Sequence, residues 1–238
     1  MPFPADLGAL GDLARWVIAW RAEANLRRPI LALYAGAHAG GDVAEARAFL
    51  EAVAAGDAAI SLGAGHLGAG LDVYDLALDR PLPAPPVEAM SERECAATMA
   101  FGMEVLAKQP DLLMLVGLGP GADDSARRVI EAIDAGKSDP LAALQTLGGR
   151  ESAAVAGAII AARTQRIPVI VDGLPALAAA LALRAANPQA TDHVRAAGPA
   201  GVTDLPTLPD LDVSRADGTA ALAALCLTKL ALAMASAE

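Results

Sequence analysis

The sequence is poor in cysteine and aromatic residues, and each shortage excludes a class of protein. Its 238 residues include two cysteines, Cys95 and Cys226, and neither lies near a second cysteine or a histidine at metal-ligand spacing. This pattern excludes a disulfide framework and a cysteine-based zinc site. Each cysteine lies in an apparent apolar helix, so we expect two reduced, buried thiols. Because only 3% of the residues are aromatic while 55% are hydrophobic, the core must consist of Ala, Leu, Val and Ile.

Positive charge is scarce as well. The chain has 18 Lys and Arg against 28 Asp and Glu, a net charge of −10. Nucleic acids and anionic membranes favour clustered cations, so we expect neither as a partner. The amino-terminal residues 1–20 lack a basic region before an apolar run, which argues against an export signal. The longest apolar stretch, 218–238, contains Lys229 and favours a buried helix or a subunit interface over a membrane span. We therefore expect a soluble, cytoplasmic protein.

Short apolar runs indicate the strands of a parallel sheet. Residues 29–34, 111–116 and 167–173 lack the alternation of a half-exposed strand, as expected where both faces are covered. Each run is followed by small residues and then by a helical pattern. This order predicts an α/β fold, with a Rossmann-like, doubly wound, mainly parallel sheet and helices on both faces, in a single domain spanning 1–238. Residues 59–62 and 71–76 are weaker strand candidates.

Helix ends are marked by capping residues. Ser91, with Glu94 three residues later, forms a capping box that opens a helix to about Lys108. Asp139 followed by Pro140 predicts the start of a short helix that ends at residues 148–149, and an Ala-rich helix follows over 151–164. Two stretches rich in proline, 80–90 and 198–218, are predicted to be irregular.

One glycine-rich turn raises a functional question. The stretch VGLGPGADDSARRVI, 116–130, places Gly117, Gly119 and Gly121 between a predicted strand and a helix. It matches neither the dinucleotide fingerprint nor a P-loop. At the carboxyl end of a parallel strand its backbone N–H groups could bind an anion, or the glycines could only permit a sharp turn, with Asp123 and Asp124 capping the helix.

The three histidines show no catalytic pattern. His38, His66 and His193 are far apart, and no serine or cysteine nucleophile motif accompanies them. His38 is the best placed, in YAGAHAGG after the first predicted strand. We interpret it as an ordinary hydrogen-bonded loop histidine.

A longer run makes the sequence recognisable. DPLAALQTLGGRESAAVAGAIIAARTQRIPVIVDGLPALAAALAL, 139–183, resembles the nicotinate-nucleotide:dimethylbenzimidazole phosphoribosyltransferase (CobT-like) family of cobalamin lower-ligand synthesis. GLGPGADD is similar to the family's G-x-G-T-G-x-D-D loop, with Pro120 in the place of Thr. YAGAHAGG is similar to its A-G-D-H-G segment and AISL to its A-I-N. ADGTAALAAL is similar to G-E-G-T-G-A-A-L, which places Asp217 at the family's catalytic glutamate.

The resemblance implies transfer of phosphoribose from nicotinate mononucleotide to a benzimidazole-type base, without a cofactor or metal. Asp217 would be the general base. Gly117, Gly119 and Gly121 would hold the phosphate. The other residues that would bind substrate or shape the site are Gly149, Glu151, Asp172, Gly173 and Gly218. The family fold adds a smaller helical part, here formed by the chain ends, and its members are usually homodimers.

Departures from the family leave alternatives open. The chain is short and lacks a G-N-T-T segment, as if two glycine loops had merged into one. Ala37 replaces an aspartate, residues 196–201 lack a serine and a histidine of the family, and Asp217 replaces the glutamate. Asp217 is equally well explained as a helix cap, and Glu151 and Asp172 as buried carboxylates paired within the fold. The alternatives are a catalytically silent paralogue that binds a nucleotide or partners a full-length enzyme, and a transferase acting on another base.

Overall fold

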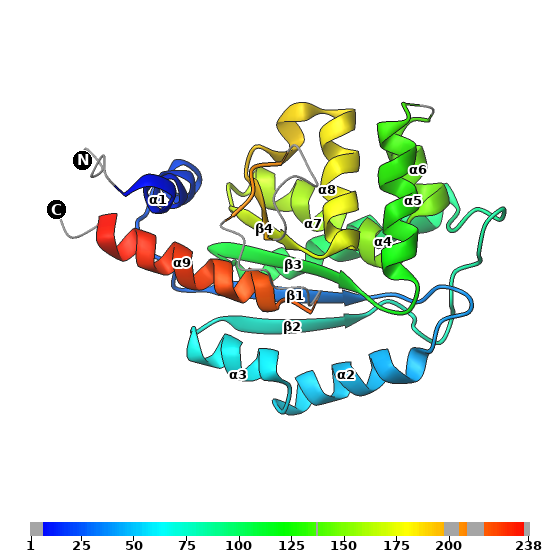
Figure 1. Ribbon diagram of the computed structural model, residues 1–238, viewed down its shortest axis with the longest axis horizontal. Helices are drawn as coiled ribbons and strands as arrows, with labels where there is room; N and C mark the ends of the chain where they lie inside the picture. Colours follow the sequence, from blue (N-terminus) through cyan, green and yellow to red (C-terminus); the bar gives the residue numbers. More distant parts are fainter. Residues whose placement is uncertain (1–6, 137, 198–204, 209–216, 236–238) are drawn as a thin grey trace.

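A five-stranded parallel sheet forms the centre of the protein (Figure 1). The structure, a computed structural model, describes residues 7–136, 138–197, 205–208 and 217–235. The strand order is β2-β1-β3-β4-β5, so the winding direction reverses between β1 and β3. The predicted doubly wound α/β fold is confirmed. The strands are β1 Pro29–Ala35, β2 Gly70–Asp75, β3 Leu112–Leu118, β4 Val169–Asp172 and β5 Val194–Ala197.

Helices cover both faces of the sheet. The described α-helices are α1 Gly8–Arg21, α2 Val43–Ala55, α3 Ala59–His66, α4 Glu92–Gly102, α5 Ala122–Asp134, α6 Pro140–Leu147, α7 Arg150–Thr164, α8 Leu174–Ala186 and α9 Thr219–Ala235, with 3-10 helices η1 Met103–Lys108 and η2 Pro188–Thr191. Figure 1 shows α4 to α8 gathered on one side of the strands, while α9 crosses in front of them beside α1.

The two faces explain the apolar runs in the sequence. Along β1, Ile30 and Tyr34 belong to an apolar cluster shared with α7 and α8, whereas Leu31 and Leu33 belong to a second cluster shared with α1 and α9. Because both faces are buried, every residue of β1 is apolar and none is exposed.

Most predicted elements are confirmed. The capping box of Ser91 and Glu94 is present at the start of α4, and η1 carries the chain on to Lys108. The Asp139 side chain accepts hydrogen bonds from the first turn of α6. The 80–90 connection contains no helix or extended strand.

Two expectations are wrong. Residues 59–62 were expected to form a strand but begin α3, because Ile60 and Ala64 are buried one turn apart on a helical face. The other weak candidate, 71–76, does form strand β2. Cys226 was expected to be buried with Cys95 but is exposed, because it lies on the outer side of α9.

One apolar stretch, Val43–His66, has the length and composition of a membrane-spanning helix. The structure divides it into α2 and α3 at Gly56, whose backbone is left-handed. Core helices of soluble proteins share such a composition, so this stretch alone does not indicate a membrane span.

Helices α4 and α7 pack backbone against backbone. A Cβ on Gly157 of α7 would overlap the carbonyl oxygen of Met99, and one on Gly102 would overlap that of Ala154. The Tyr34 hydroxyl donates to the carbonyl of Gly102 at 2.8 Å and so ties this contact to β1. Neither glycine can gain a side chain without separating the helices.

We predict that Gly157→Ala lowers the free energy of unfolding by about 1–3 kcal/mol, since the methyl group meets fixed backbone. Gly65→Ala is the matched control, because Gly65 is an exposed glycine of α3 with open space around it. There alanine should be neutral or stabilise by up to about 1 kcal/mol. Urea unfolding of both variants tests this contrast, and equal effects would contradict it.

Candidate functional site

A cavity of about 580 Å³ opens at the carboxyl ends of β1 and β3, where the winding of the sheet reverses. Ligands bind at this position in doubly wound sheets. Its walls are the first half of α2, the β3–α5 loop and Asp217. The structure therefore brings Gly119, Gly121 and Asp217, three of the predicted site residues, around one cavity.

Close packing explains the glycines of the β3–α5 loop. A Cβ on Gly119 would overlap the carbonyl oxygen of Gly36, and its φ is +127°. A Cβ on Gly121, whose φ is +76°, would lie 2.8 Å from the Cβ of His38. A Cβ on Gly117 would lie 2.7 Å from the Cβ of Pro175. The turn requires glycine at 119 and 121 even without a ligand, and close packing at the end of β3 explains Gly117. The role of all three in holding phosphate stays a prediction.

The cavity wall is acidic. Asp42 and Glu45 face it from the start of α2, Asp217 faces it from before α9, and no Lys or Arg is found among its described lining residues. Phe49 and Leu118 add apolar surface. This combination favours a flat ring that offers N–H groups or carries positive charge over a phosphate group. Sequence reasoning missed Asp42 and Glu45, although Asp42 was visible as a helix-capping residue directly after YAGAHAGG.

Asp217 has both features that the sequence suggested. Its Oδ1 accepts hydrogen bonds from the backbone N–H of Thr219 at 3.1 Å and from the Thr219 hydroxyl at 2.5 Å, so it caps α9. The same residue is part of the cavity wall. The cap fixes the position of the carboxylate at the edge of the cavity, and its action as a base stays a prediction.

Asp172 ends β4 and holds the start of α9. It is 3% exposed, and its Oδ2 accepts from the backbone N–H of Ala221 at 3.0 Å. Burial raises the pKa of this carboxyl from its ordinary 3.8 to about 7, and the charge of Asp217 adds to the shift, while backbone hydrogen bonds oppose it. Asp172 is thus bonded within the fold, and it lies close enough to Asp217 to sense its charge.

Three predicted glycines are not among the described residues that line the cavity. They lie instead at the starts of helices around it. Gly149 is the N-cap of α7, and Gly173, with a φ of +82°, is the N-cap of α8. Gly218 precedes α9 with a φ of +96°, and a Cβ there would lie 2.7 Å from the Cδ1 of Ile60.

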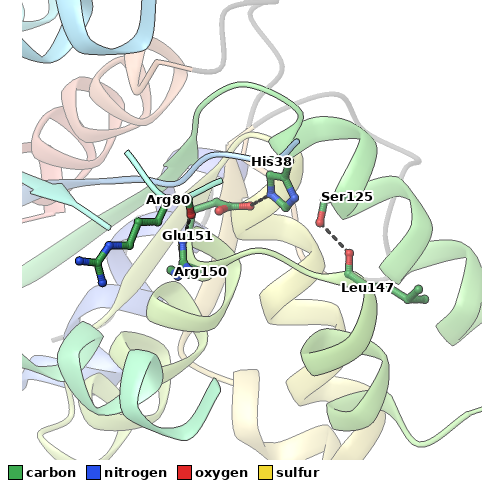
Figure 2. Close-up of polar contacts among 6 residues, drawn as sticks. All are labelled: His38, Arg80, Ser125, Leu147, Arg150 and Glu151. Atoms are coloured by element: carbon green, nitrogen blue, oxygen red, sulfur yellow. Dashed lines mark hydrogen bonds and ion pairs between the residues drawn. The ribbon is translucent and has the colours of Figure 1, made fainter. Parts of the chain in front are cut away.

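A buried hydrogen-bonded pair joins the β1–α2 loop to the first turn of α7 behind the cavity (Figure 2). Nε2 of His38 lies 3.1 Å from Oε1 of Glu151, and the Glu151 side chain is completely buried in the first turn of α7. The other carboxyl oxygen of Glu151 has no hydrogen-bond partner in the described part of the chain. Figure 2 also shows the Ser125 hydroxyl, which donates to the Leu147 carbonyl at 2.7 Å and ties α5 to α6. His38 is therefore more than an ordinary loop histidine. No local sequence signal reveals this pair, because its members are 113 residues apart.

His38 also contacts the glycine loop directly. Its backbone N–H donates to the carbonyl of Pro120 at 3.0 Å, and its Cβ lies against Gly121. Because Pro120 and Gly121 line the cavity, the His38–Glu151 pair fixes one of its walls.

We predict that His38→Asn releases this wall while His38→Gln largely retains it, because the amide nitrogen of Gln reaches the position of Nε2 and that of Asn does not. In His38→Asn, hydrogen exchange of amides 36–42 and 118–122 should accelerate by about tenfold or more. Loss of the hydrogen-bond partner of the buried Glu151 side chain should also lower the free energy of unfolding by about 1–3 kcal/mol. Equal exchange in the two variants, or acceleration spread evenly over the sheet, would argue against the role of the pair.

We predict a pH-dependent stability from Asp172. Its pKa is raised on folding, so the native state binds more protons than the unfolded state between about pH 4 and pH 7. The stabilisation from the protonated form is complete below pH 4 and is lost as the pH rises through 7. Asp172→Asn keeps an acceptor for the Ala221 N–H and removes the titration. Relative to wild type, it should gain on the order of 2–4 kcal/mol between pH 4 and pH 8 in urea unfolding. Asp79→Asn, an exposed control, should show no such trend.

Comparisons with known proteins agree with this architecture. A family described as "Phosphoribosyltransferase" matches residues 3–134 and 125–237, so its two matched segments share residues 125–134 of α5. A nicotinate-nucleotide–dimethylbenzimidazole phosphoribosyltransferase of Allorhizobium ampelinum is 40% identical over 236 residues, covering 80% of this chain and 68% of that protein. The protein of the same name from Rhizobium rhizogenes is 41% identical, covering 80% and 69%.

Solved structures show the same fold. The crystal structure of CobT from Thermus thermophilus superposes with a TM-score of 0.81 and 22% identity, covering 98% of this chain and 91% of that one. Together with the sequence matches, this shows that the chain belongs to the nicotinate-nucleotide–dimethylbenzimidazole phosphoribosyltransferase family, and it spans 68–69% of the length of the two relatives named above.

Proposed function

We propose that this protein transfers phosphoribose from nicotinate mononucleotide to a benzimidazole-type base, in the synthesis of the cobalamin lower ligand. The observation that carries this proposal is the position of Asp217. It occupies the place of the family's catalytic glutamate, and its carboxylate is held by Thr219 at the wall of the cavity. The names of the relatives support the same reaction.

The reaction needs a base and no metal. Nicotinate is bonded to C1′ of the ribose as a positively charged pyridinium, so it leaves as a neutral ring without being protonated. Asp217 takes the proton from one azole nitrogen of the acceptor while the other nitrogen attacks C1′ from the opposite face. The new C1′–N bond forms as the bond to the pyridinium breaks, and the configuration at C1′ inverts.

The cavity suits the acceptor ring. Phe49 and Leu118 provide apolar surface for a flat bicyclic base, and Asp217 lies on the same cavity wall as a proton acceptor. We propose, following the family, that the phosphate lies on the glycine loop of Gly117, Gly119 and Gly121. Asp42 and Glu45 repel an anion nearby, and we therefore expect weak binding of the nucleotide in the absence of the acceptor.

A second candidate is a catalytically silent paralogue that binds a nucleotide or partners a full-length enzyme. It is favoured by the extent of the match, since the chain covers 68–69% of the two relatives named above. The cation-free lining among the described cavity residues agrees with it.

Further proposals concern the assembly. We propose one functional domain with α1 and α9 as a small helical part, a homodimer, and a cytoplasmic location without nucleic acid or membrane partners. Leu62 of α3 and Leu230 and Met234 of α9 are exposed apolar side chains that support an interface between two copies.

We predict that nicotinate is released from nicotinate mononucleotide only when 5,6-dimethylbenzimidazole is present. Asp217→Asn keeps the helix cap and removes the base, so release should fall by about 10²–10⁴-fold. Asp217→Glu restores the family's residue and should retain or raise the rate, whereas Asp79→Asn should leave it unchanged. Chromatography of nicotinate and of the ribotide product measures all four proteins.

The outcomes separate the candidates. No release by the wild type, with nucleotide binding detected by calorimetry, would replace the transferase with the silent paralogue. Release that occurs with other azoles or purines but not with dimethylbenzimidazole would identify a related transferase of different acceptor specificity. Unchanged release by Asp217→Asn would remove Asp217 from the mechanism.

A further inference from the structure

A second cavity, of about 520 Å³, lies at the other side of the sheet, between α1 and the edge strand β5. Pro206 and Thr207 line one side of it. It shares no described lining residue with the cavity at Asp217. A role for it is therefore independent of the proposed transferase.

Two arginines, Arg15 and Arg195, line this cavity, and most N–H groups of Arg195 make no described hydrogen bond. Its side chain is half-buried, and its guanidinium lies over the Trp16 ring, 5.3 Å from the centroid. In the described part of the chain it donates one hydrogen bond, to the Val194 carbonyl at 3.2 Å, and has no carboxylate within 4 Å. A guanidinium has five N–H groups, so most of its donors remain available to a ligand.

The acidic residues of the cavity are already engaged. Asp12 bonds to Arg15 at 2.5 Å, and Asp192 lies 3.9 Å from Arg163. Burial lowers the pKa of Arg195, and the charge of Asp12 opposes that effect, so Asp12 acts on it only through space. Among the described charged side chains of this cavity, Arg195 is therefore the one without an oppositely charged partner within 4 Å, although the whole protein is acidic.

The cavity also contains a buried hydrogen-bond donor, the indole N–H of Trp16. Trp16 lines the cavity and is 4% exposed, yet its indole Nε1 has no hydrogen-bond partner among the residues that the structure describes. A buried N–H without an acceptor costs about 1–3 kcal/mol. An acceptor atom bound in the cavity would remove that cost. Leu13 and Pro206 supply apolar walls that fit a flat ring.

We propose that this cavity is a binding site for a small aromatic carboxylate, whose carboxylate pairs with Arg195 and whose ring lies against Trp16, Leu13 and Pro206. A carboxylate matches the guanidinium in two parallel hydrogen bonds, and its oxygens supply the acceptor that Trp16 lacks. The volume is sufficient for such a ligand.

The chain provides its own reporter for a test. Its two tryptophans are Trp16 and Trp20, and both line this cavity. Tryptophan emission of the full chain, excited at a wavelength where the ligands do not absorb, should change saturably on titration with nicotinate and with benzoate. Nicotinamide and benzamide, which have the same rings without the carboxylate, should bind about tenfold more weakly or not at all.

Variants assign the response to the site. Arg195→Met keeps the stem over Trp16 and removes the charge, so affinity should fall by about tenfold or more, while Arg195→Lys should retain part of it. Trp16→Phe keeps a ring, removes the N–H and leaves Trp20 as reporter, and should weaken binding by several-fold. Circular dichroism and thermal unfolding confirm that each variant is folded.

Failure of the binding-site proposal can be distinguished from failure of the proposed transferase function, because Asp217→Asn should bind nicotinate and benzoate as the wild type does. No saturable change with either carboxylate, an equal response to the neutral amides, or a response unaffected by Arg195→Met would each overturn the proposal. The proposal is also overturned if a second copy of the chain covers the cavity. In that case the change in tryptophan emission would appear only after dilution to monomer.

Discussion

The burial of one carboxylate constrains the loops on which the candidate site is built. Glu151 enters the fold from the first turn of α7 and makes one contact with His38. Its side chain occupies space that Gly36 and Gly149 leave open, since a Cβ on either would overlap it. Enclosing such a group with one described partner costs free energy, and the close packing of Glu151 against Gly36 and Gly149 leaves the surrounding backbone little room to move. The same packing holds the backbone segments that form the cavity walls.

Local sequence signals predict the framework well. The runs around Leu31 and Met114 have apolar residues for both faces of the sheet, as a strand covered on both sides requires. Caps such as Ser91 and Asp139 act within three residues and are visible in sequence. The failure at Ile60 has the opposite cause, because four apolar or small residues fit a strand and a helix equally until their neighbours are known.

The candidate site was predicted only in part, for a physical reason. The glycines before α5 and the acid before α9 were recognised by resemblance, and the fold brings Gly119, Gly121 and Asp217 together. The partner of His38 is distant in the chain, and pairings of this kind depend on tertiary packing that no local pattern encodes. The acidic wall at Asp42 and Glu45 was missed because a capping residue and a solvent-facing helical acid look ordinary in sequence.

The overlap of the two family matches lies in α5, and its place in the fold bears on how the length of such a chain can change. The first match ends at residue 134 and the second begins at residue 125, so both ends lie within this helix. A change of chain length at α5 does not interrupt a strand of the sheet. Here β3 pairs directly with β1 and β4, so its backbone hydrogen bonds remain complete. A change of length outside the strands is thus compatible with an intact hydrophobic core.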